Sequence, residues 1–84
     1  MAKVEIYTWD TCPFCRRAKE LLDSKDVDYT EFMIKGDEKA RDEMAKISNG
    51  RRTVPQIFIN DQWVGGCDDI HLLEAEGKLD KMLG

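Results

Sequence analysis

Two cysteines separated by two residues, Cys12 and Cys15, are the side chains of this chain best suited to chemistry. Thiols at this spacing can close a small disulfide ring with little backbone movement, as a reversible dithiol/disulfide couple requires. Apolar and polar residues alternate over 4–7, as in a half-buried strand, and apolar residues recur at helical spacing over 18–22. The pattern therefore predicts a strand that ends before Cys12 and a helix that begins just after it.

This helix start predicts different roles for the two thiols. Pro13 suits the first helical position, because its missing N–H would have no partner within the helix. Cys12 then becomes the N-cap residue, where unsatisfied N–H groups and partial positive charge favour a thiolate over a thiol. We expect Cys12 to be acidic and nucleophilic. Cys15, inside the first turn, should be less exposed and less acidic, and should act as the resolving thiol.

A zinc site is the alternative that the spacing leaves open. With Cys67 and His71, the two cysteines make a ligand set that zinc accepts. Zinc knuckles sit on tight turns, however, whereas Cys12 and Cys15 are predicted to lie at a helix start, and the two pairs are far apart in sequence. We therefore favour redox chemistry without a bound metal and interpret His71 as a surface or packing residue.

Length and composition predict one small globular domain that spans residues 1–84. Hydrophobic residues make up 42% and charged residues 36%, and no stretch approaches the ~18 apolar residues of a membrane span. The N-terminal residues do not resemble a signal peptide. Three cysteines, an odd number, argue against a secreted disulfide framework, so we expect a cytoplasmic monomer whose disulfides are transient.

The charge is negative overall but unevenly distributed. A net charge of −4 without a basic stripe argues against nucleic-acid binding. Basic residues nevertheless cluster within 16–19, after Cys12, and again at Arg51 and Arg52. Together the clusters would form a basic mouth around the reactive thiol. We interpret Lys19 as part of a solvated helix face, and Arg51 and Arg52 as functional because they precede the segment Thr53-Val54-Pro55.

The remaining periodicities predict the element order β-α-β-α-β-β-α. Strands are expected at about 3–8, 27–32, 56–59 and 62–64, and helices at about 13–25, after Asp37 to about 48, from Asp68 or Asp69 to Gly77, and in a last turn over 79–83. The strand–helix–strand start implies a parallel pair with a right-handed crossover, and the later hairpin adds antiparallel strands. Helices on a four-stranded mixed sheet make this a thioredoxin-like α/β fold.

Four segments, in the same order, give the chain its resemblance to a known family. These are Val-Glu-Ile-Tyr-Thr at 4–8, Thr-Cys-Pro-Phe-Cys at 11–15, Thr-Val-Pro-Gln-Ile-Phe-Ile at 53–59 and Gly-Gly-Cys-Asp-Asp at 65–69. Along essentially its whole length the chain resembles a bacterial-type dithiol glutaredoxin.

The resemblance implies a glutathione-dependent thiol–disulfide oxidoreductase. Cys12 would reduce protein–glutathione mixed disulfides alone and protein disulfides together with Cys15. Glutathione would regenerate the enzyme as a co-substrate, with no tightly bound cofactor. Its partners would be glutathionylated or disulfide-bonded proteins.

The resemblance also implies a groove for glutathione. A cis Pro55 would place Val54 so that its N–H and C=O pair with the cysteine residue of glutathione. The N–H groups of Cys67 and Asp68 would bind the γ-glutamyl carboxylate, and Asp68 or Asp69, with Asp68 preferred, its ammonium. The expected glutathione-binding residues are Phe14, Arg52, Thr53, Val54, Pro55, Gly66, Cys67, Asp68 and Asp69.

Two positions depart from the family pattern. Trp9 stands where a lysine is usual, so Arg52 or Arg51 must supply more of the positive charge, and Trp9→Lys is expected to tighten glutathione binding or to lower the pKa of Cys12. Phe14 stands where tyrosine is more common, with little expected effect.

The third thiol, Cys67, is interpreted mainly as a small residue in a tight loop, and as a redox-sensitive thiol only in second place.

Two rival functions follow from the same motif. A thioredoxin-type electron donor more often carries Gly-Pro between its cysteines and needs no glutathione groove. Some glutaredoxins carry an iron–sulfur cluster, but by resemblance Pro13 and the second cysteine argue against that function here.

Overall fold

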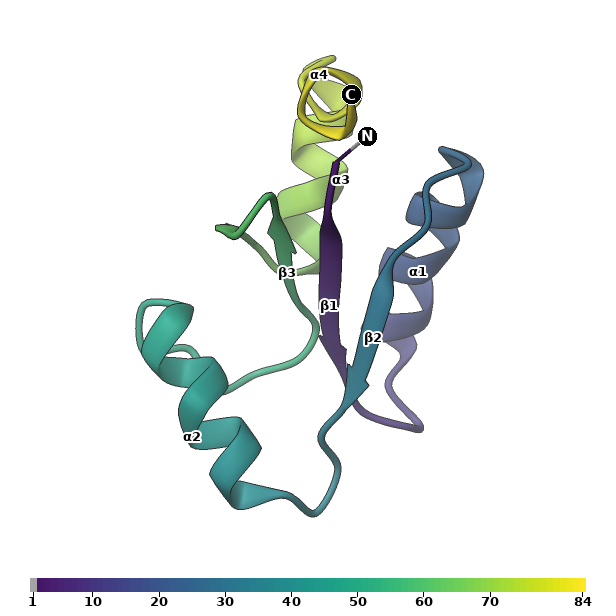
Figure 1. Cartoon of the computed structure of the whole chain (residues 1–84). Helices are drawn as coiled ribbons and strands as arrows, with labels where there is room; N and C mark the ends of the chain where they lie inside the picture. Colours follow the sequence, from purple (N-terminus) through teal and green to yellow (C-terminus); the bar gives the residue numbers. More distant parts are fainter. Residues whose placement is uncertain (1) are drawn as a thin grey trace.

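Residues 2–84, which the computed structural model describes, form four strands and four helices. In chain order they are β1 (Val4–Thr8), α1 (Pro13–Ser24), β2 (Thr30–Met33), α2 (Glu38–Ile47), β3 (Gln56–Ile59), β4 (Gln62–Gly65), α3 (Cys67–Ala75) and α4 (Leu79–Leu83). Figure 1 shows β2, β1 and β3 side by side, with α1 and α3 beside the sheet and α2 apart from them. The predicted element order is confirmed, and the last predicted turn is α4.

The four strands form one mixed sheet in the order β2-β1-β3-β4. β1 runs parallel to β2 and antiparallel to β3, and β3 pairs antiparallel with β4. The two central strands thus bring the end of β1, which leads to Cys12, next to the start of β3, which follows Pro55. Tyr7 pairs with Gln56 in this register. The mixed sheet and the thioredoxin-like fold are as predicted.

The main core lies between the sheet and helices α1, α3 and α4. Ile6, Leu22, Ile57 and Ile70 are fully buried in it, and Leu79 of α4 completes it. Full burial of each such side chain contributes roughly 1.5–3 kcal/mol to folding. The strand ends that carry the cysteine loop and the proline loop are therefore held on a rigid frame.

The opposite face of the sheet carries an aromatic cluster. The ring of Tyr7 lies 5.0 Å from that of Phe32 and 5.7 Å from that of Phe58, centroid to centroid. Met44 of α2 is fully buried but lies outside the main core. Within residues 2–84, no helix has both the length and the apolar character to cross a bilayer.

Two predicted boundaries were wrong. β2 begins at Thr30 rather than Val27, because Val27 and Tyr29 pack against the core before the pairing with β1 begins at Thr30. Helix α3 begins at Cys67 with Gly66 as its N-cap, so neither Asp68 nor Asp69 caps it.

Asp69 has a different task at the start of α3. It is the third residue of the helix, and its Oδ2 accepts the Gly66 N–H at 2.8 Å. A carboxylate at that position commonly reaches back to the N-cap N–H in this way.

Candidate active site

Cys12 occupies the N-cap position of α1, as predicted. Its backbone is extended (φ −112°, ψ 106°), and Pro13 is the first helical residue. The N–H of Cys15 donates a hydrogen bond to the Sγ of Cys12 over 3.2 Å. No acidic side chain lies in the first turn of α1 to oppose a negative charge on this sulfur. The half-exposed Cys12 sulfur therefore lies at the N-terminus of a helix, where backbone N–H groups and partial positive charge gather.

Cys15 lies in quite different surroundings. Its side chain is only 1% exposed. Burial, and then a hydrogen bond with Cys12, raises the pKa of Cys15 to about 12. Both cysteines are free thiols in this structure. At neutral pH Cys15 is protonated, which leaves the first attack to Cys12.

The loop before β3 brings a second segment against the cysteines. The Val54–Pro55 peptide bond is cis, as the resemblance implied. The Val54 carbonyl oxygen lies 3.9 Å from the Sγ of Cys12. The backbone of Val54 is therefore beside the reactive sulfur.

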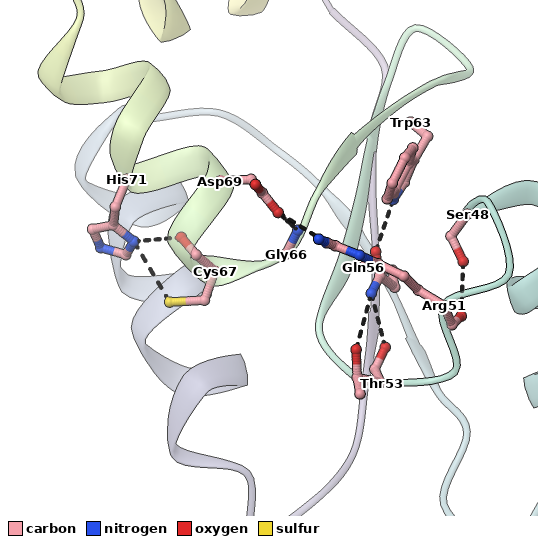
Figure 2. Close-up of polar contacts among 9 residues, drawn as sticks. All are labelled: Ser48, Arg51, Thr53, Gln56, Trp63, Gly66, Cys67, Asp69 and His71. Carbon is pink, nitrogen blue, oxygen red and sulfur yellow. Dashed lines mark hydrogen bonds and ion pairs between the residues drawn. The ribbon is translucent and has the colours of Figure 1, made fainter.

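Gln56 and Trp63 hold this loop, although the sequence analysis treated both only as strand residues. The buried Gln56 donates from Nε2 to the carbonyl oxygen of Thr53 at 3.0 Å and contacts its Oγ1 at 3.3 Å. Trp63 Nε1 donates to Gln56 Oε1 at 2.7 Å (Figure 2). A polar amide in an apolar strand was the only signal that could have identified this network.

A groove of about 610 Å³ lies between this loop and the N-terminus of α3. All nine expected glutathione-binding residues line it. The full lining is Phe14, Arg51, Arg52, Thr53, Val54, Pro55, Gln56, Gly66, Cys67, Asp68 and Asp69. A Cβ at position 66 would lie 3.1 Å from the Pro55 carbonyl oxygen, so a glycine there allows the two walls to approach closely.

The two arginines before Thr53 have different partners. Arg52 pairs with Asp42 and, at 3.2 Å, with Glu38, both on α2. Arg51 instead pairs with Asp69 of α3 over 3.0 Å, and its guanidinium lies 5.3 Å from the centroid of the Trp63 ring. From the sequence, Arg52 was expected to supply positive charge for glutathione, with Arg51 as the second choice.

A second cavity, of about 420 Å³, borders Cys12 and shares no lining residue with the groove. Its lining is Trp9, Asp10, Thr11, Cys12, Pro13, Cys15, Arg16, Lys19 and Met33. The predicted basic clusters thus border different cavities instead of forming one basic mouth. Lys19 pairs with Glu31 at 3.0 Å and is only half-exposed, so it is not merely solvated.

Trp9, which stands in place of the usual lysine, carries a cation on its ring. The guanidinium carbon of Arg41, on α2, lies 4.3 Å from the ring centroid. This distance is typical of a cation–π contact. The sequence analysis did not single out Arg41, and nothing in the local pattern marked it.

The third thiol, Cys67, is buried and lies 3.5 Å from Nδ1 of His71 (Figure 2). Burial raises the pKa of Cys67. The zinc hypothesis required these two residues to join Cys12 and Cys15. Nowhere in residues 2–84 do three Cys, His, Asp or Glu side chains group as metal ligands.

A dithiol at a helix start beside a cis-proline loop, on this mixed sheet, defines a thiol–disulfide oxidoreductase of the thioredoxin-like fold. The Glutaredoxin family model matches residues 4–64. The chain is 58% identical to Glutaredoxin 3 of Escherichia coli K12 over 83 residues, which cover 99% of both proteins. The chain belongs to the glutaredoxin family.

Two solved structures agree with this assignment. A glutaredoxin from Brucella melitensis superposes with a TM-score of 0.87 at 48% identity, over 99% of this chain and 89% of that one. A buckwheat glutaredoxin, solved as a complex with glutathione, gives 0.90 at 27% identity, over 98% of this chain and 76% of that one. Family membership favours a glutathione-dependent enzyme over the thioredoxin alternative.

Proposed function

We propose that Cys12 is the nucleophile of a glutathione-dependent reductase of mixed disulfides. Its thiolate attacks the glutathione sulfur of a protein–glutathione disulfide, and the protein leaves as a thiolate that takes up a proton. A second glutathione thiolate then attacks the Cys12 adduct, which releases glutathione disulfide and restores Cys12. The observation that carries this proposal is the 3.2 Å hydrogen bond from the Cys15 N–H to the Cys12 sulfur, next to the groove.

Protein disulfides follow a second route that uses both thiols. Cys12 forms a mixed disulfide with the substrate, and Cys15 attacks Cys12 to expel the substrate thiol and close the Cys12–Cys15 bridge. Glutathione then reduces this bridge. Glutaredoxin potentials of roughly −200 to −230 mV lie near the cytosolic glutathione poise, so the enzyme can run in both directions.

The groove is the proposed seat of glutathione. Val54 supplies an N–H and a C=O beside Cys12, and the N–H groups of Cys67 and Asp68 face a carboxylate at the start of α3. The remaining proposed contacts are Phe14, Arg52, Thr53, Pro55, Gly66 and Asp69, all of which line the groove. The glutathione complex of the buckwheat relative supports the use of glutathione here.

We also propose the oligomeric state, the cell compartment and the protein partners of the enzyme. Residues 2–84 share one sheet and one main core, which supports a single domain. The proposed working form of this domain is a monomer. A dithiol that must be reduced again by glutathione suits the cytoplasm, where glutathione keeps thiols reduced. Its protein partners are then glutathionylated or disulfide-bonded cytoplasmic proteins.

The test is the intact mass of a Cys15→Ser, Cys67→Ser variant after exposure to glutathione disulfide. One stable glutathione adduct on Cys12, removed quickly by free glutathione, is the expected result. An adduct that free glutathione removes no faster than from an ordinary thiol would show that the groove does not function. The absence of any adduct would contradict the nucleophile assignment.

A further inference from the structure

The resolving step of the proposed dithiol route, in which Cys15 attacks Cys12, is hindered by the burial of Cys15. Burial, and then a hydrogen bond with Cys12, raises the pKa of the Cys15 thiol to about 12. Such a thiol is almost entirely protonated at neutral pH, whereas the thiolate is the form that attacks. A group that stabilises the Cys15 thiolate would therefore speed the resolving step.

Lys19 lies on the same face of α1 as Cys15. The two residues are four positions apart in the helix, a spacing that places their Cβ atoms roughly 5–6 Å from each other. Both line the cavity of about 420 Å³ beside Cys12, which shares no lining residue with the proposed glutathione groove. Arg16, the other cation in this lining, is adjacent to Cys15 in the helix, where side chains do not face each other. Lys19 is therefore the cation best placed to act on the buried sulfur.

A hydrogen-bonded network holds Lys19 at this cavity. Its Nζ lies 3.0 Å from Oε2 of Glu31, and the same oxygen accepts a hydrogen bond from the hydroxyl of the fully buried Thr8 at 2.6 Å. The Thr8 hydrogen bond, and then Lys19, lowers the pKa of Glu31, so this carboxylate stays ionised. The Lys19 side chain is only 30% exposed, and Glu31 is not part of the cavity lining. The cation is thus the member of the ion pair that borders the cavity.

The charge of Lys19 acts on Cys15 in the required direction. Burial and the Cys12 thiol raise the pKa of Cys15, whereas a backbone hydrogen bond at Trp9 and the positive charge of Lys19 lower it. Once Cys12 is joined to a substrate, it carries neither a free thiol nor a charge. The balance at Cys15 then shifts toward the groups that favour the thiolate, at the stage of the reaction where a thiolate is needed.

We propose that Lys19 assists the resolving step, because its ammonium stabilises the thiolate that Cys15 forms beside the cavity. Cys15 gives its proton to solvent, and its thiolate attacks the Cys12 sulfur. The Cys12–Cys15 bond forms as the bond from Cys12 to the substrate breaks, and the substrate leaves as a thiolate that takes up a proton. Lys19 acts through Cys15 and is not needed where Cys12 reacts alone. The proposal rests on the proposed function, because it requires Cys15 to be the resolving thiol.

Stopped-flow reaction with dithiodipyridine separates the two steps in a Cys67→Ser background. Attack by Cys12 releases one thiopyridone, at a rate that depends on the probe concentration. Attack by Cys15 on the resulting adduct releases a second thiopyridone, at a rate that does not. The probe is uncharged at neutral pH, so loss of a cation leaves its encounter with the protein unchanged. Lys19→Gln and Lys19→Arg are compared with Lys46→Gln, which removes an exposed cation in the last turn of α2.

Lys19→Gln should slow the second release about threefold and leave the first unchanged. A thiol whose pKa rises by about one unit loses about tenfold in thiolate, but the more basic thiolate recovers about threefold in nucleophilicity. Lys19→Arg, which keeps the charge, should retain most of the rate, and Lys46→Gln should match the background. A rise in ionic strength from about 0.05 to about 0.5 M should slow the second release of the background protein and not that of Lys19→Gln, because salt screens the charge.

The double variant Lys19→Gln, Glu31→Gln tests for an indirect cause. It should be as slow as Lys19→Gln, because it lacks the same cation. A second release restored to the background rate would show that the unpaired Glu31 carboxylate slows the reaction, and would overturn the proposal. Equal slowing of both releases in Lys19→Gln, or an unchanged second release, would overturn it as well. If the background protein gives no second release, the proposed role of Cys15 has failed, and that of Lys19 fails with it.

Discussion

The N–H of Cys15 donates a hydrogen bond to the sulfur of Cys12 over 3.2 Å. Cys15, the proposed resolving residue, therefore also positions the sulfur of the proposed nucleophile. The bond comes from the backbone and not from the Cys15 side chain. The thiol of Cys15 can therefore be removed without removing the hydrogen bond. This separation allows the two proposed roles to be tested one at a time.

Cys15→Ser should keep the reduction of glutathione mixed disulfides close to the wild-type rate and abolish the reduction of protein disulfides. The serine retains the backbone donor to Cys12 but has no thiol to expel a bound substrate. Steady-state assays with a glutathionylated peptide and with a disulfide-bonded protein would measure the two activities. Full activity on the protein disulfide would contradict the role of Cys15.

The buried thiol of Cys15 should make stability depend on alkaline pH. Its pKa in the folded protein is about 12, above the value of 9.0 for an ordinary thiol. The folded state therefore keeps a proton that the unfolded state loses. The stabilisation is fully present below pH 9 and falls by about 1.4 kcal/mol for each pH unit between 9 and 12.

Urea unfolding of a Cys12→Ser variant, compared with Cys12→Ser, Cys15→Ala between pH 8 and 10.5, would measure this effect. The substitution of Cys12 prevents disulfide formation, and the comparison cancels the titration of tyrosines and lysines. The difference in unfolding free energy should shrink as the pH rises above 9. A difference that stays constant would show that Cys15 does not titrate as the structure implies.

Asp69→Ala should destabilise the protein by about 1 kcal/mol at pH 7, because it removes the acceptor of the Gly66 N–H at the start of α3. The Gly66 N–H, and then Arg51, lowers the pKa of Asp69 below its usual 3.8. The contribution is therefore present above pH 3.8 and is lost as the pH falls through the lower pKa of the folded protein.

Chemical unfolding of Asp69→Ala and of the parent protein at pH 7 and near pH 2.5 would test this. Asp61→Asn, in the β3–β4 turn, serves as a control for the loss of an exposed carboxylate charge, because asparagine tolerates the left-handed backbone of this position (φ 65°). A stability difference for Asp69→Ala that is as large at the acidic pH as at pH 7 would show that the charge of Asp69 is not involved.

Trp9→Lys should tighten glutathione binding two- to fivefold, about 0.5–1 kcal/mol, the scale of an exposed ion pair. The lysine would add an ammonium beside the cysteine loop and would free Arg41 from the ring that it now covers. Calorimetric titration with S-methylglutathione would measure the affinity, and Trp9→Phe keeps an aromatic ring as a control. An affinity of Trp9→Lys equal to that of the parent would refute the expectation.

The parts of the site that were predicted correctly depend on neighbouring residues in the chain. The N-cap role of Cys12 follows from Pro13 and the helix behind it, and the hairpin follows from the turn at Asn60 and Asp61. The cis bond at Pro55 and the membership of the groove came from the resemblance to glutaredoxins. The spacing of local motifs was sufficient for the element order.

The parts that were missed depend on segments far apart in the chain. Arg51 and Arg52 are adjacent and chemically identical, and only the carboxylates brought near by α2 and α3 distinguish them. Likewise, Gly66 and not Asp68 caps α3, where a close approach to the Pro55 carbonyl leaves little space for a side chain. No local pattern contains either piece of information.

The two tryptophans of the chain carry a further consequence. Each has an arginine over its ring: Arg41 on Trp9, which lines the cavity beside Cys12, and Arg51 on Trp63, which is bonded to Gln56 of the groove. With no other indole in the molecule, tryptophan fluorescence arises at two places, in the lining of the cavity beside Cys12 and next to Gln56 in the wall of the groove. The protein thus has an intrinsic optical reporter for the cavity and another for the groove, and single Trp→Phe variants would let each be read separately.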